Sequence, residues 1–182
     1  MKDFDEISQI LDSGTSQEKI NILEKLSNST DHKIIKKIIS KLDDPDIQVR
    51  GEAFSCLILN PNKISELLID SLKDERKNVR GFTALVLANR KDISAISSVI
   101  PLTKDDSSRV RGCALGALGY LKAHEAKKEI DDCLLDENIE VRKSALKAIV
   151  DIGESIPEEK IQEISKNKDR EIENLLVQVK KR

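Results

Sequence analysis

The chain has 182 residues and a formal net charge of −2, although 35% of its residues are charged. This balance of acidic and basic side chains argues against a positive electrostatic field that would attract nucleic acid. No apolar run approaches the roughly 20 residues that a membrane-spanning helix needs, so we expect no membrane partner. Aromatic residues are only 2% of the chain, which leaves Ile, Leu, Val and Ala to build the core.

The three cysteines, Cys56, Cys113 and Cys133, form an odd number and include no CxxC pair. Two of them lie on predicted apolar helix faces, so we interpret all three as small buried hydrophobic residues. The sequence also shows no basic-then-apolar leader. These features predict a cytoplasmic protein.

Apolar residues recur at helical spacing along the chain. Gly14 is expected to end the first helix in a left-handed conformation. Thr15 and Glu18 have capping-box spacing, and Asp31 can cap a later helix. Pro101 falls in the last turns of its helix and predicts a local bend. The twelve predicted helices cover about 3–12, 15–28, 31–42, 45–60, 62–73, 76–89, 92–104, 107–121, 123–135, 138–152, 157–167 and 169–181.

One sequence pattern recurs at a nearly fixed interval. Val49, Val79, Val110 and Val141 are 30, 31 and 31 residues apart, and each is followed by Arg. Lys19 holds the Arg position of a degenerate earlier copy. A period of this length, with room for two helices and a turn, is typical of an all-α superhelix, or α-solenoid. We predict a single domain, 1–182, with helix pairs at about 15–42, 44–73, 74–104, 105–135 and 136–167 and half-repeat caps at 3–12 and 169–181.

An Asp precedes each repeated Arg by six residues. We interpret these pairs as a structural ladder, because stacking such units brings each Arg close to an Asp of its own or the adjacent repeat. A row of anion-binding arginines is the alternative, but it would leave the arginines unpaired. The predicted ladder consists of Asp44, Arg50, Asp74, Arg80, Asp105, Arg111, Asp136 and Arg142.

At these residues the chain resembles the HEAT-repeat superfamily, and specifically the short HEAT-like repeats of the phycobilisome-lyase type. The shared signature is a turn Asp, then Val-Arg, then an Ala-rich helix, and it is clear over 43–60, 73–91, 104–122 and 135–153. The resemblance implies a right-handed α-α superhelix whose second helices line a concave binding surface. The partner-binding candidates are then the outward positions Lys33, Lys36, Lys37, Lys63, Glu66, Asp70, Ser94, Ser97, Ser98, Lys127, Lys128 and Asp131.

Enzymes of this superfamily fit the sequence poorly. HEAT-like deoxyhypusine hydroxylases hold two irons with several His-Glu pairs, whereas this chain has only His124-Glu125 and one further histidine, His32. Bilin lyases bind a large planar chromophore, which we expect to need more aromatic lining than one Tyr and three Phe. We therefore assign no catalytic residue, metal or cofactor.

HEAT-like DNA glycosylases use a basic groove with aromatic residues. The only basic cluster here is the helix face around Lys36, Trp is absent, and the net charge is slightly negative, so we expect no nucleic-acid partner. Our hypothesis is a non-catalytic scaffold or adaptor, expected as a monomer, that binds a protein or peptide on its concave face. The alternative is a lyase-like or accessory enzyme subunit that acts on a protein-bound prosthetic group.

Overall fold

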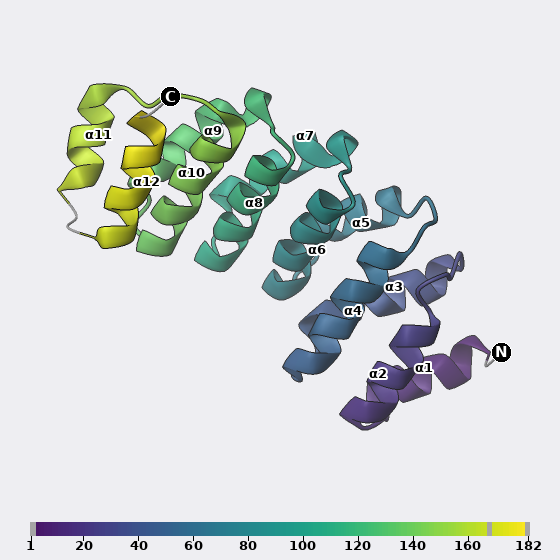
Figure 1. Cartoon of the computed structure of the whole chain (residues 1–182). Helices are drawn as coiled ribbons and strands as arrows, with labels where there is room; N and C mark the ends of the chain where they lie inside the picture. The colour runs from purple at the N-terminus through teal and green to yellow at the C-terminus, as the bar shows by residue number, and fades with distance from the viewer. Residues whose placement is uncertain (1–2, 167–168, 181–182) are drawn as a thin grey trace. The chain divides into compact units, whose positions relative to one another are not determined.

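The computed structural model describes residues 3–166 and 169–180, which form twelve α-helices and five short 3-10 helices without a β-strand (Figure 1). The predicted all-α repeat architecture is confirmed. The described residues fall into two compact units, one ending at Arg90 and one beginning at Lys91. Residues 167 and 181, the predicted ends of the last two helices, lie outside the described residues.

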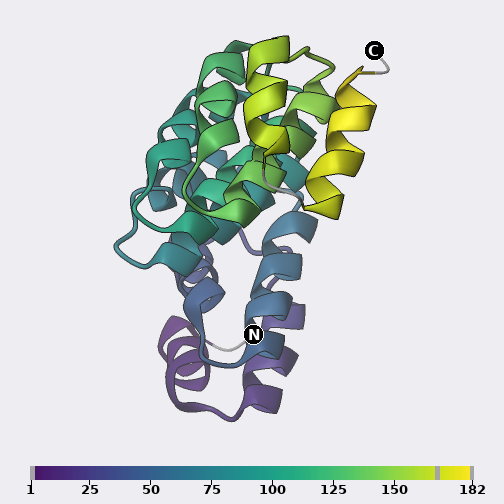
Figure 2. The same ribbon diagram turned by 90° about the vertical axis from the view of Figure 1, so that its left-hand side faces the viewer.

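Unit 1 contains two layers of helices, which Figure 2 shows from the side. In one layer α2 packs on α4 and α4 packs on α6, while α1 and α3, then α3 and α5, are neighbours in the other layer. Both layers contribute fully buried side chains, such as Leu23 and Leu57 from the first and Ile35 and Leu68 from the second. The elements are α1 (Phe4–Ser13), α2 (Ser16–Lys25), α3 (His32–Ser40), η1 (Lys41–Asp43), α4 (Ile47–Leu59), α5 (Ser65–Ser71) and α6 (Lys77–Asn89).

Unit 2 repeats this plan, with α8, α10 and α12 neighbours in one layer (Figure 1). The α8 and α10 backbones approach closely, because a Cβ added at Gly119 would lie 2.9 Å from the Ala148 Cα. The elements are η2 (Ile93–Ala95), α7 (Ile96–Val99), η3 (Ile100–Lys104), α8 (Ser108–Tyr120), η4 (His124–Ala126), α9 (Lys127–Asp132), η5 (Cys133–Leu135), α10 (Ile139–Ile152), α11 (Glu158–Ser165) and α12 (Arg170–Lys180).

The local signals of the sequence act largely as predicted. Thr15 and Glu18 form the capping box at the start of α2, and the Asp31 carboxylate accepts from the Lys33 N–H at 2.7 Å to cap α3. The left-handed prediction for Gly14 is wrong, since this residue is extended at φ −70° and ψ 164°. A Cβ there would instead lie 2.5 Å from the Ile10 carbonyl oxygen, so a close backbone approach explains the glycine.

The helix predicted over 92–104 is broken into η2, α7 and η3, with the change to 3-10 geometry at Ile100, directly before Pro101. The predicted bend therefore coincides with a change of helix type. Proline is not its only cause, because 124–135 shows the same order of η4, α9 and η5 without a proline.

Candidate functional site

The repeated Asp and Arg residues both bind the backbone of their own turn. Each Asp carboxylate accepts from the N–H two residues later; for Asp136 the distance to the Asn138 nitrogen is 2.8 Å. Each Arg donates from Nη1 to the carbonyl of that same Asp, six residues earlier, at 2.6–3.0 Å. These contacts hold the turn in one conformation. The sequence had indicated contacts between the side chains, and the bonds to turn carbonyls were missed.

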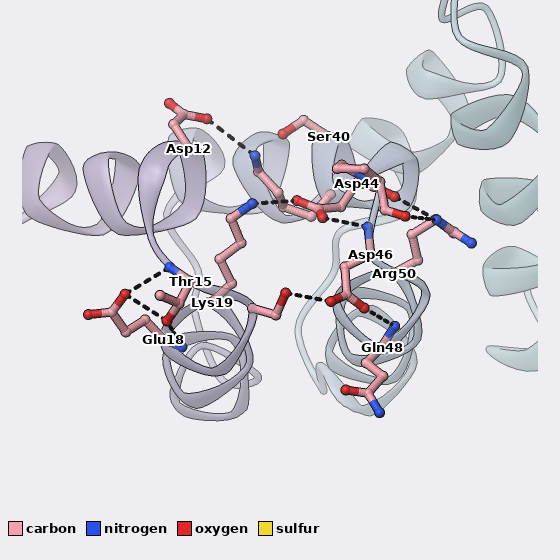
Figure 3. Close-up of polar contacts among 12 residues, drawn as sticks. Asp12, Thr15, Glu18, Lys19, Ser40, Asp44, Asp46, Gln48 and Arg50 are labelled. Atoms are coloured by element: carbon pink, nitrogen blue, oxygen red, sulfur yellow. Dashed lines mark hydrogen bonds and ion pairs between the residues drawn. The ribbon is translucent and has the colours of Figure 1, made fainter.

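Side chains of the preceding repeat form ion pairs with Asp44 and with Asp136. Lys19 lies 2.9 Å from Asp44, and the Ser16 hydroxyl donates to Asp46 of the same turn (Figure 3). In unit 2 the Arg111 guanidinium binds the Asp136 carboxylate through two bonds of 2.8 Å. At the second turn in chain order, the Asp74 carboxylate binds Arg76 of the same turn, at 2.8 and 2.7 Å.

A cleft of about 440 Å³ opens beside the Arg111–Asp136 pair in unit 2. Six of its lining residues are acidic and two are basic, so the cleft has a negative electrostatic potential. Two acidic pairs, Asp105-Asp106 and Asp136-Glu137, come from successive turns between repeats. Its lining consists of Thr103, Lys104, Asp105, Asp106, Arg111, Glu129, Asp132, Cys133, Asp136 and Glu137.

The buried groups of the cleft are held in fixed protonation states. Burial raises the pKa of Asp136, but the Arg111 guanidinium and the Asn138 N–H outweigh it and bring that pKa below its ordinary value of 3.8. Burial raises the pKa of Cys133 to about 11, and its thiol lies 3.5 Å from the Thr103 carbonyl oxygen. The thiol therefore stays protonated at neutral pH, which makes it a poor nucleophile.

The twelve residues predicted to bind a partner do not line this cleft. Lys37 forms an ion pair with Asp12, Lys127 pairs with Asp131 at 2.5 Å, and the Ser94 hydroxyl donates to Asp92 at 2.6 Å. Ser98 is partly exposed. The exposed residues among the twelve are Lys33, Lys36, Lys63, Glu66, Asp70, Ser94, Ser97 and Lys128.

Sequence reasoning missed Glu129 and Asp132, which α9 places on the cleft, and the acidic partners of the turn Asp residues, Asp106 and Glu137. The available signal was an acidic residue directly after the turn Asp, which recurs at Asp105-Asp106 and Asp136-Glu137. The turn Asp carboxylates bind backbone N–H groups, whereas the acidic residue after each of them is exposed.

The described ranges, 3–166 and 169–180, contain no group of three or more His, Cys, Asp or Glu side chains that could hold a metal ion. His124 is 61% exposed and lies 3.1 Å from Glu154. In the same part of the chain no helix is long and apolar enough to span a membrane.

Comparison with known proteins settles the family. The sequence model of the HEAT repeats matches residues 35–113 and 65–150. The chain belongs to the HEAT repeat family. No curated protein matches its sequence.

Solved structures show the same HEAT and armadillo-type solenoid fold. The complex of CpcE and CpcF of phycocyanin lyase from Nostoc sp. PCC7120 has a TM-score of 0.68 and 16% identity, and the match covers 82% of this chain and 99% of that one. A designed armadillo repeat protein in complex with the peptide (KR)4 has a TM-score of 0.55 and 18% identity, with 99% of each chain covered. A structure on TOG–tubulin binding specificity has a TM-score of 0.57 and 18% identity and covers 92% and 82% of the chains.

Proposed function

We propose that this HEAT-repeat chain is a non-catalytic binding module that takes up a polypeptide segment carrying Lys or Arg side chains. The observation that carries the proposal is the cleft beside Arg111, where six acidic side chains meet two basic ones. Asp106, Asp132 and Glu137 are exposed there, so their charges face solvent and are accessible to a partner. Positive charge on a partner would increase the rate at which it associates with the cleft and would fix the position in which it binds.

The cleft favours a side chain of a polypeptide over a small molecule. It is lined mainly by charged groups, whereas small-molecule sites are mostly apolar with a few polar groups. The Arg111–Asp136 pair demonstrates that a guanidinium can bind a carboxylate of this cleft in the bidentate geometry. The designed armadillo repeat protein that binds (KR)4 supports this choice, because it has the same type of fold.

The exposed positions of the second helices extend the proposed contact surface beyond the cleft. Ser97 and Lys128 of unit 2 are exposed and could contact the residues that flank the basic side chain. We also propose that the protein acts as one continuous domain and that its contacts follow the second-helix layer.

The test is binding of a fluorescein-labelled Lys-Arg octapeptide, measured by anisotropy, against a Glu-Lys octapeptide of the same length. Reversing two exposed cleft charges, with Asp106→Lys and Asp132→Lys together, should weaken binding of the basic peptide roughly tenfold or more. The matched control is Glu75→Lys with Glu173→Lys, which makes the same change in net charge at exposed positions outside the cleft and outside the second helices. Equal losses in both double variants would show non-specific attraction and refute the cleft as the site.

A second candidate is an accessory subunit that acts on a protein-bound prosthetic group, and the likeness to CpcE and CpcF favours it. This function predicts a chromophore that stays with the protein during purification and absorbs visible light. A colourless protein that nevertheless binds the basic peptide would favour the first proposal.

A further inference from the structure

The solvent face of α4 lacks charged side chains along its whole length. Ile47, Gly51, Phe54 and Ile58 follow one another at helical spacing, and Leu59 lies beside the last of them. Ile47 is 73% exposed and Leu59 is 70% exposed, while Phe54 and Ile58 are half-buried. We call these five residues the α4 stripe. The opposite side of the helix supplies the core, and the polar residues that share the solvent face, Gln48 and Ser55, are uncharged.

Helix α10 holds the same place in its repeat as α4, and its solvent face is charged. In α10 the positions that correspond to Gly51, Ser55 and Leu59 are Lys143, Lys147 and Asp151. Surface helices of globular proteins normally present polar or charged residues to water. The solvent face of α10 follows this rule, and that of α4 departs from it.

The α4 stripe continues onto α6. The Phe54 and Phe82 rings meet edge to face, with centroids 6.4 Å apart and an interplanar angle of 72°. Leu85, one turn beyond Phe82, is half-buried. The apolar surface therefore spans two neighbouring helices of unit 1, which makes it wider than a single exposed side chain.

The shape of the stripe suits a helix. Gly51 lies at its middle, is exposed, and a Cβ added there would meet nothing within 4 Å. The backbone is therefore bare at this point, and the distance between packed helices depends on side-chain size at the contact. A partner helix with apolar residues at the same spacing could lie along the stripe with one side chain over Gly51.

The charge at the border of the stripe defines the partner further. Glu52 belongs to α4 and Glu24 to the neighbouring helix α2. Burial, together with the nearby charge of Glu24, raises the pKa of Glu52. Neither carboxylate forms a salt bridge within the described part of the chain. A cation placed there would relieve the repulsion between the two carboxylates.

We propose that the α4 stripe binds an amphipathic α-helix of a partner polypeptide, with Leu- or Ile-type side chains on the stripe and a Lys or Arg beside Glu24 and Glu52. This surface lies in unit 1 and does not depend on the acidic cleft of unit 2. The two proposals can therefore fail separately.

The test uses isotope-labelled protein and three synthetic peptides that share one length. The first is a helix former with a Leu stripe and Lys borders, the second is its scrambled sequence, and the third has Glu borders. We expect the first peptide to shift the amide signals of α4, including that of Gly51. The third peptide should bind with an affinity lower by roughly tenfold or more.

Gly51→Arg should abolish the shifts by placing a charge in the stripe, and its unfolding midpoint will show that it folds. The matched control is Gly112→Arg at the corresponding position of α8, which should leave binding unchanged. Three results would overturn the proposal: shifts in α4 that are equal with the scrambled peptide, an absence of shifts in α4 and α6, or a dimer of the free protein that Gly51→Arg dissociates. The last result would assign the stripe to a second copy of the chain.

Discussion

Arg111 and Asp136 are 25 residues apart in sequence, yet the guanidinium and carboxylate are joined by two hydrogen bonds of 2.8 Å. Their side chains are only 10% and 11% exposed. The same guanidinium also donates to the carbonyl of Asp105 at 3.0 Å. One residue therefore connects two successive turns of unit 2 at the edge of the acidic cleft.

Arg111→Ala should lower the free energy of unfolding by about 1–3 kcal/mol, because it leaves the Asp136 carboxylate and the Asp105 carbonyl without their partner. Arg111→Lys should lose less, since an ammonium keeps the charge but cannot form the bidentate contact. Urea unfolding followed by circular dichroism measures both changes. An unchanged midpoint in the alanine variant would refute a stabilising role for the pair.

The stability of unit 2 should depend on pH through Asp136. Because the folded-state pKa of Asp136 is lowered, its ion pair contributes fully above the unfolded-state pKa of about 3.9 and is lost as the pH falls through the lower folded-state value. Asp136→Asn should thus lower the unfolding midpoint at pH 7, and its difference from wild type should shrink below pH 4. A difference that stays constant down to pH 2 would contradict this linkage.

Alanine substitutions at two glycines, one in α4 and one in α8, should change the stability of the protein in opposite directions. Gly51→Ala should stabilise the protein by about 0.5–1 kcal/mol, because the new Cβ meets nothing within 4 Å and the unfolded chain loses entropy. Gly119→Ala should destabilise it by about 1–3 kcal/mol, since its Cβ would lie 2.9 Å from the Ala148 Cα. Thermal unfolding of the two variants in parallel provides the comparison, and equal shifts would show that helix packing does not distinguish the sites.

Thr83→Val should raise the free energy of unfolding by about 1 kcal/mol. The Thr83 side chain is fully buried in α6, and its hydroxyl has no hydrogen-bond partner among the residues that the structure describes. Valine keeps the shape of the side chain and removes the unsatisfied polar atom. Thr83→Ser, which keeps the hydroxyl and deletes the methyl, is the matched control and should be less stable than wild type. A loss of stability in the valine variant would mean that the hydroxyl does find a partner.

The repeat period explains why the helices could be located from sequence. Val49, Val79, Val110 and Val141 mark the same buried position of successive first helices, and all four are at most 1% exposed. Capping residues such as Thr15 and Asp31 act within three or four residues, so their effect is visible locally in the sequence. The acidic cleft and the α4 stripe were not predicted, because both depend on which side chains remain exposed after packing.

The sequence by itself determined the all-α repeat architecture of this protein, its register and most of its helix ends, because periodicity and capping are short-range properties of the chain. Only the tertiary structure decided how the repeated Arg residues are used. All four bind the carbonyls of their own turn, and Arg111 in addition binds an Asp of the next turn. The physical reason is that a hydrogen bond depends on distances of about 3 Å between atoms that lie far apart in sequence, and packing of the repeats sets those distances.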